Sequence, residues 1–279
     1  MEPLDPPPAP AVLEIGPRPS LRSWLSDLWE YRAVLSALAR RDLRSRYRKA
    51  VLGVGWAVLQ PLVQVGVFTL IFRGVARVDT PVPYPVFVLA SLLPFNLFQQ
   101  IVSQGTPSFA NLHAVVSKVY FPRVFTVMAA SASPLVNGAV TAGILAGLLA
   151  GFRVAVPASA LLAIPLLLCM VLLSVGAAAM LAALNARFRD VQHVLPVALQ
   201  VLLYVSPVLY PMDRLPEAGR MLASVNPVTG LVDGFRSCLL GTEPHSWGLV
   251  GAGAALSIAL FAAGLLVFDR TQAALVDEM

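Results

Sequence analysis

Charged residues divide the chain into long apolar stretches. Six of these stretches contain no Asp, Glu, Lys or Arg. A helix needs about 20 residues to cross the hydrocarbon core of a membrane, which is about 30 Å thick. Each stretch has room for one such helix, and none has clear room for two. The pattern therefore predicts six transmembrane helices in a domain of residues 51–268, within the stretches 51–72, 80–117, 124–152, 154–186, 191–212 and 244–268.

The type of apolar run favours helices over a membrane-spanning barrel. A barrel strand alternates polar and apolar residues, whereas runs such as LLAIPLLLCMVLL, residues 161–173, do not alternate. The composition agrees, because 57% of the residues are hydrophobic and only 13% are charged, against about 25% charged in soluble proteins. We therefore expect an all-α integral membrane protein, and we explain its net charge of +5 by membrane topology rather than by nucleic acid.

The distribution of basic residues gives the chain a direction. With the N-terminus in the cytoplasm, 14 of the 20 Lys and Arg residues lie on cytoplasmic segments. Such an excess of basic residues marks the cytoplasmic side of membrane proteins. We therefore expect a multi-pass protein with both termini in the cytoplasm, a disordered proline-rich tail over residues 1–19 and a short cytoplasmic tail over residues 269–279.

The outer segment between the fifth and sixth spans, residues 211–246, is unusual. It is moderately apolar but is interrupted by Pro211, Pro216 and Pro227. Prolines at these positions prevent a continuous span. Short re-entrant half-helices fit the pattern, because non-helical backbone at membrane depth must be buried in protein or line a water-filled cavity.

Residues 20–50 precede the first span and combine an amphipathic pattern with a basic run. Leucines recur at helical spacing in residues 20–39, which predicts a helix on the inner membrane surface, with Trp24 and Trp29 as anchors. The run RRDLRSRYRK follows. It fits either a topology signal that contacts anionic lipid or a mouth that binds a phosphate-bearing substrate, and the candidates for this mouth are Arg44, Arg46, Arg48 and Lys49.

The cytoplasmic stretch SFANLHAVVSKVYFPR, residues 108–123, carries a second amphipathic pattern. Leu112, Val115, Val116 and Val119 share one face of a short helix that Pro122 ends. The helix is either an ordinary loop helix or one that docks into a groove of a soluble partner.

The chemistry that the spans lack is equally informative. They contain amides such as Gln60, Gln64 and Asn137 but no carboxylate. Transporters driven by protons or sodium ions usually need ionisable groups at membrane depth, so this class is disfavoured. The chain also lacks a glycine-rich phosphate-binding motif, a catalytic constellation and a metal-like spacing of histidines. We expect no catalytic residue, no metal and no cofactor on this chain.

Five segments, in this order, resemble the permease subunit of type-2 ABC exporters, in the branch that exports O-antigen, capsule or teichoic-acid polymers. The resemblance covers roughly residues 31–269 and is carried by YRKAVLGVGWAVLQPLVQVGVFTLIF, YPVFVLASLLPFNLF, SKVYFPR, LNARFRDVQHVLPVALQVLLYVSPVLYP and NPVTGLVDGFRSCLLG.

The resemblance implies a homodimer in a bacterial inner membrane, bound to two copies of an ATP-binding subunit that holds ATP and Mg. The implied substrate is a polysaccharide linked to a lipid pyrophosphate. The implied outer gate contains Pro207, Pro211, Asn226 and Pro227. The implied contact with the ATP-binding subunit comprises Ser117, Lys118, Val119, Tyr120, Phe121, Pro122 and Arg123.

A sugar polymer would need a pathway lined by aromatic faces, which bind sugars well. Aromatic residues near span ends are otherwise anchors in the lipid interface, and both interpretations stay open. The candidates are Trp56, Tyr84, Phe87, Phe95, Phe98, Tyr204 and Tyr210.

Two other classes of protein compete with this interpretation. An exporter of small lipophilic compounds has the same general fold and needs no basic mouth. A membrane-embedded transferase needs acidic and histidine residues that converge at one face. Its only local candidates, Asp190 with His193 and Asp213 with Glu217, fall on opposite sides of the expected topology.

Overall fold

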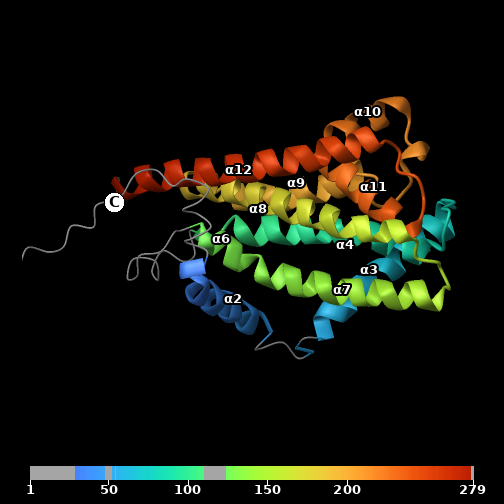
Figure 1. Ribbon diagram of the computed structural model, residues 1–279, viewed down its shortest axis with the longest axis horizontal. Coiled ribbons are helices and arrows are strands. Elements are labelled where there is room, and N and C mark those ends of the chain that lie inside the picture. Colours follow the sequence, from blue (N-terminus) through green and yellow to red (C-terminus); the bar gives the residue numbers. More distant parts are fainter. Residues whose placement is uncertain (1–28, 48–51, 54, 110–123, 278–279) are drawn as a thin grey trace, which may run out of the picture.

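The computed structural model of the chain describes residues 29–47, 52–53, 55–109 and 124–277. Every regular element in these residues is a helix, and long helices lie side by side as a bundle (Figure 1). The elements are α2 (Arg32–Tyr47), α3 (Gly55–Phe68), η1 (Thr69–Val75), α4 (Tyr84–Gly105), α6 (Phe125–Ala130), α7 (Ala132–Gly151), η2 (Ala158–Leu162), α8 (Ala163–Arg187), α9 (Val191–Val205), η3 (Met212–Arg214), α10 (Glu217–Val225), α11 (Pro227–Leu240) and α12 (Trp247–Asp277).

Five helical segments are long and apolar enough to cross a membrane, which confirms an all-α, multi-pass membrane protein. They are Gly55–Val75, Tyr84–Gly105, Phe125–Gly151, Ala158–Arg187 and Trp247–Phe268. The fifth predicted span, within residues 191–212, is shorter than expected. Helix α9 has 15 residues, which extend roughly 22 Å at the helical rise. It ends because Ser206 precedes Pro207 and takes an extended conformation, as residues before proline prefer.

Helix α4 is the centre of the bundle. In its membrane-length window 78% of the residues are buried, against 17% for Gly55–Val75. Apolar residues occur around its whole circumference, which is the pattern of a helix surrounded by protein. Helices α3, α7, α8, α9 and α11 all contact it. The first span thus lies on the outer surface of the bundle, whereas the second forms its core.

Helices α8 and α12 pack with their backbones in close contact. A Cβ atom added to Gly176 would lie 2.5 Å from the Leu260 carbonyl oxygen, and one added to Gly264 would lie 2.3 Å from the Gly176 carbonyl oxygen. Membrane helices often associate through such small residues, because the packing of lipid-like side chains alone gains little over lipid. These two glycines therefore set how close the two helices come.

Helix α2 differs from the prediction in both its length and its content. The expected helix ended at Ala39, whereas α2 runs to Tyr47 and includes most of the basic run. Tyr31, just before α2, contacts Phe125 of α6 with ring centroids 6.1 Å apart, and Leu35 and Leu38 pack against the same cluster. The basic run is thus largely the second half of a helix that is docked on the bundle.

Short helices occupy the segment between α9 and α12, as the pattern of prolines predicts. Helix α10 is mostly exposed, while α11 is almost entirely buried and contacts α4, α8 and α12. Pro227 occupies the first turn of α11, where proline is tolerated. The depth of α10 and α11 in a membrane stays a prediction.

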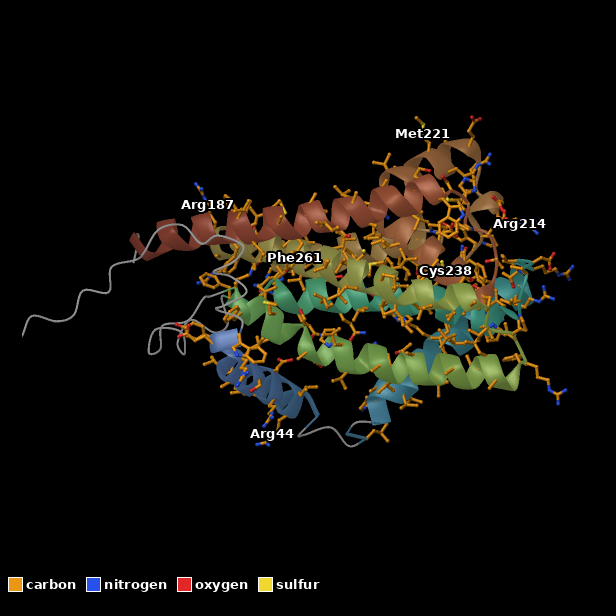
Figure 2. All side chains as sticks on the ribbon, viewed as in Figure 1. Arg44, Arg187, Arg214, Met221, Cys238 and Phe261 are labelled. Carbon is orange, nitrogen blue, oxygen red and sulfur yellow. The ribbon has the colours of Figure 1, made fainter. Side chains whose placement is uncertain are left out.

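The two ends of the bundle carry different elements. Helix α2 and the C-terminal end of α12 lie near one end, and η1 and α10 lie at the other (Figure 1). Arg187 lies toward the end of the bundle where α2 is located, and Arg214 lies at the opposite end of the bundle (Figure 2). This grouping matches the predicted division of the chain into two sides. Which side is cytoplasmic stays a prediction.

Candidate functional site

A buried ion pair on α11 is the most distinctive polar feature of the described residues. The Arg236 guanidinium donates to Asp233, one helical turn earlier, and the two residues are 5% and 6% exposed. The same guanidinium lies over the Phe87 ring of α4, 4.3 Å from its centroid. Two charges are costly to bury unless they are paired and hydrogen-bonded, so the surrounding contacts must satisfy both groups.

Those contacts connect four parts of the chain. The Arg236 Nη1 atom donates to the Pro207 carbonyl oxygen at 3.0 Å and to the Ser91 hydroxyl of α4 at 3.2 Å. On the other side, the Asp233 Oδ2 atom accepts from the His245 backbone N–H at 2.8 Å. The pair therefore connects α11 to α4, to the segment after α9 and to the segment before α12.

Burial lowers the pKa of Arg236, and the neighbouring Asp233 carboxylate acts in the opposite direction. Because a guanidinium keeps its proton in proteins, the group remains a buried cation. Asp233 supplies the matching negative charge. Outside the buried pair, the His245 Nδ1 atom lies 3.1 Å from the exposed Asp213 carboxylate of η3. A line of polar contacts thus runs from the interior to the surface.

The segment 206–211, which follows α9, is held from three directions. Besides the bond to Arg236, the Tyr84 hydroxyl of α4 donates to the Leu209 carbonyl oxygen at 2.8 Å. The Asn226 side-chain N–H₂ donates to the Ser206 hydroxyl at 2.8 Å, and its oxygen accepts from the Val228 N–H at 3.0 Å as the N-cap of α11. We call residues 206–211 the post-α9 segment.

The structure therefore brings together the predicted gate residues. Pro207 is buried, Pro211, Asn226 and Pro227 are half-buried, and all belong to the post-α9 segment or to the start of α11. Their role as a gate stays a prediction. Sequence reasoning missed Asp233 and Ser91. The spacing of Asp233 and Arg236 on one helical face was the available signal, in a segment otherwise poor in charge.

The candidate pathway aromatics occupy two different environments. Tyr84, Phe87, Phe95 and Phe98 are buried in the core of the chain. In this structure they therefore contact protein, and Tyr84 and Phe87 support the post-α9 segment and Arg236. Trp56 and Tyr204 are about half-exposed, on α3 and α9, and the half-buried Tyr210 donates its hydroxyl to the Tyr204 carbonyl. Burial raises the pKa of Tyr210.

An open groove of about 440 Å³ runs along α3, next to Trp56, Gln60, Gln64 and Phe68. Gln64 accepts a hydrogen bond of 2.9 Å from the Asn96 side chain of α4. A similar amide pair, Asn137 to Gln100 at 2.8 Å, joins α7 to α4. Exposed amides within a membrane-length helix are costly in lipid, so this face is better suited to protein or water.

The predicted basic mouth and coupling contact are described only in part. Arg44 is exposed on α2 (Figure 2), and Arg46 belongs to the same helix. Arg48, Lys49 and the coupling residues Ser117, Lys118, Val119, Tyr120, Phe121, Pro122 and Arg123 lie outside the described residues. Arg187 and Arg189 are exposed where α8 ends and α9 begins, and Arg187 lies toward the same end of the bundle as α2 (Figure 2).

The bundle of apolar helices and its buried polar contacts define a multi-pass helical membrane protein. Residues 33–240 match the family described as ABC-2 type transporter. Since this match covers most of the chain, the chain belongs to the ABC-2 type transporter family.

Curated relatives are similar over nearly the same length. The "O-antigen export system permease protein RfbA" of Myxococcus xanthus is 26% identical over 245 residues, which are 87% of this chain and 94% of the relative. A protein of the same name from Klebsiella pneumoniae is 25% identical over 85% of this chain and 91% of its own. The "Polysialic acid transport protein KpsM" of Escherichia coli is 25% identical over 75% of this chain and 82% of its own.

Proposed function

We propose that this chain is the membrane permease of an ATP-driven exporter. It moves a polysaccharide linked to a lipid pyrophosphate, of the O-antigen or capsule type, from the cytoplasm across a bacterial inner membrane. The observation that carries the proposal is the similarity to O-antigen export permeases, which extends over 94% of the relative's length in one case. Membership in the ABC-2 type transporter family supports it.

The permease acts as a homodimer with two copies of an ATP-binding subunit. The groove on α3, lined by Trp56, Gln60 and Gln64, supports the second copy, because the exposed Gln60 amide would be unfavourable in lipid. The polymer passes between the two copies. Trp56 and Tyr204, which are exposed on α3 and α9, are the predicted aromatics best placed to contact it.

The cytoplasmic end binds the substrate and contacts the ATP-binding subunit. Arg44, Arg46, Arg48 and Lys49 form a basic mouth for the pyrophosphate, since arginine donates paired hydrogen bonds to phosphate. Both termini are cytoplasmic in this arrangement. Residues 117–123 contact the ATP-binding subunit, which binds ATP and Mg. Closure of that subunit is passed to the helices, and the post-α9 segment opens at the outer end.

Reconstitution tests which subunit hydrolyses ATP. Liposomes that contain only this chain should show no ATPase activity, and activity should appear with the ATP-binding subunit. A Phe121→Asp, Arg123→Glu double variant of normal abundance should lose export, because the contact between the subunits is broken. Intact export in this variant, or ATP hydrolysis by the chain alone, would contradict the proposal.

Depletion in cells tests the substrate. Loss of the permease should cause a lipid-linked glycan to accumulate on the cytoplasmic side of the membrane, measured by extraction and mass spectrometry. An exporter of small lipophilic compounds would leave the glycan pool unchanged and would change drug retention instead. The two classes of exporter are therefore separated by one experiment.

A further inference from the structure

A polar pocket lies where α2 meets the end of α4 and the start of α6. Its volume is about 340 Å³, and its lining includes Arg41 and Asp42 of α2, Ser103 and Gln104 of α4, and Thr126 of α6. The groove on α3 is lined mostly by apolar side chains, whereas this pocket is rich in hydrogen-bonding groups. It lies at the end of the bundle where α2 is located (Figure 1).

Two polar atoms in this pocket have no partner among the residues that the structure describes. Thr126 is only 1% exposed, and its Oγ1 atom makes no hydrogen bond there; the same holds for the Gln104 Oε1 atom. Nearby hydroxyls are satisfied locally, because Thr106 donates to the Val102 carbonyl at 2.8 Å and Ser108 donates to the Gly105 carbonyl at 2.6 Å. A buried polar group without a partner is costly, so these two atoms indicate a ligand.

The charges around the pocket restrict the class of ligand. Arg41 is exposed at its edge, and a guanidinium binds phosphate with paired hydrogen bonds. The Asp42 carboxylate also lines the pocket and would repel a bare phosphate, but it can accept a hydrogen bond from a hydroxyl. The Gln104 oxygen likewise needs a donor. One ligand matches Arg41, Gln104 and Thr126 together if it combines a phosphate with free hydroxyls.

We propose that this pocket binds a phosphate ester that carries free hydroxyls, with the glycerol phosphate head group of an anionic membrane lipid as its source. Arg41 binds the phosphate at the pocket edge, and Gln104 and Thr126 bind the hydroxyls inside. Helix α2 is predicted to lie on the membrane surface, which is the level of lipid head groups. The ligand would contact α2 and also α4 and α6, the helices on either side of residues 110–123.

Native mass spectrometry of the purified chain, titrated with defined lipids, tests the proposal. Phosphatidylglycerol has a phosphate with free hydroxyls, phosphatidic acid has the phosphate alone, and phosphatidylcholine, a zwitterion with no net charge, is the reference. We expect phosphatidylglycerol to be retained several-fold better than the other two. Thr126→Val keeps the side-chain shape and should weaken phosphatidylglycerol retention by about five-fold, the usual effect of one lost hydrogen bond.

Arg41→Gln should weaken retention of both anionic lipids by about ten-fold, because a charge-assisted bond is stronger. Arg40→Gln is the matched control, since Arg40 is an exposed neighbour on α2 that does not line the pocket, and it should leave retention unchanged. Gln104→Leu should repeat the effect of Thr126→Val and serves in its place if that variant does not fold. Soluble glycerol phosphate distinguishes the source: competition indicates that a free phosphate ester also binds, and no competition indicates the lipid alone.

Two results would overturn the proposal. Equal retention of phosphatidylglycerol and phosphatidic acid by the unmodified chain would remove the role of the hydroxyls. Unchanged retention in Thr126→Val, together with higher thermal stability, would show that the pocket holds only water and that the buried hydroxyl only destabilises the fold. Neither result depends on export activity, so the pocket and the exporter assignment can fail separately.

Discussion

Asp233→Leu is the change to which we expect the fold to be most sensitive. The substitution removes the carboxylate that pairs with Arg236, while the guanidinium keeps its charge and its buried position. Loss of one partner of a buried pair typically costs about 3–5 kcal/mol. It also removes the acceptor for the His245 N–H. For a chain of this length we expect the thermal midpoint to fall by roughly 10 °C.

Replacement of both charges should be much less harmful. In an Asp233→Leu, Arg236→Met double variant no buried charge remains, so the largest part of the penalty disappears. Both variants share the lost acceptor of the His245 N–H. The cost specific to the double variant is the Pro207 carbonyl oxygen, which loses its donor, since the Ser91 hydroxyl still donates to the Phe87 carbonyl at 3.1 Å. One unsatisfied carbonyl costs about 1–3 kcal/mol. The double variant should therefore be more stable than Asp233→Leu alone.

The measurement is the fraction of purified chain that stays monodisperse by size-exclusion chromatography after heating in detergent. Asp79→Leu is the control, because Asp79 is an exposed carboxylate paired with Arg73 at 2.8 Å, and exposed pairs contribute little. A double variant as unstable as Asp233→Leu would refute the reasoning, because the penalty would then come from packing and not from an unpaired charge.

Three further predictions concern packing, capping and accessibility. Gly176→Val should destabilise the chain by about 1–3 kcal/mol or more, because its Cβ would lie 2.5 Å from the Leu260 carbonyl oxygen. The control Gly143→Val should leave stability unchanged, because a Cβ at Gly143 has no neighbour within 4 Å. Equal midpoints of the two variants in the heating assay would argue against close packing of α8 and α12. Asn226→Ala should cost about 1 kcal/mol as a lost N-cap, and Asn226→Ser should recover most of that stability; a full effect in both variants would exclude the cap as its cause. Burial raises the pKa of the Cys238 thiol. A Cys169→Ala chain should therefore react slowly with maleimide at neutral pH and rapidly after denaturation, as followed by mass spectrometry. Rapid labelling of the folded chain would contradict the burial of α11.

The sequence predicts the membrane helices well, because an apolar stretch of about 20 residues without charge is typical of a membrane span and rare in other structures. It fails where local backbone preferences decide the length of an element. The extended conformation of Ser206 shortens α9. Conversely, α2 continues beyond its apolar pattern to Tyr47, because arginine has a high intrinsic preference for helices.

The candidate site was predictable in place but not in its contacts. Prolines and Asn226 mark the post-α9 segment and the start of α11 in the sequence. The pairing of Arg236 with Ser91 and Pro207 depends on residues far apart in the chain, which no local pattern contains. The same limit applies to Phe95, because a helix that is apolar on every side does not reveal which face meets protein and which meets lipid.

The central position of α4 has a consequence for the biosynthesis of this protein. Helix α4 is the second membrane-length segment to leave the ribosome, yet its contacts with α8, α9 and α11 form with segments that are made later. Until the later segments arrive, Ser91 and the Gln100 amide, whose partner Asn137 lies on α7, face lipid or the insertion machinery. The Arg236 side chain, which joins α4 to the post-α9 segment, can take its place only when the chain is nearly complete. Folding of this bundle therefore depends on its last-synthesised third, and incomplete chains expose the polar groups of α4 to quality control.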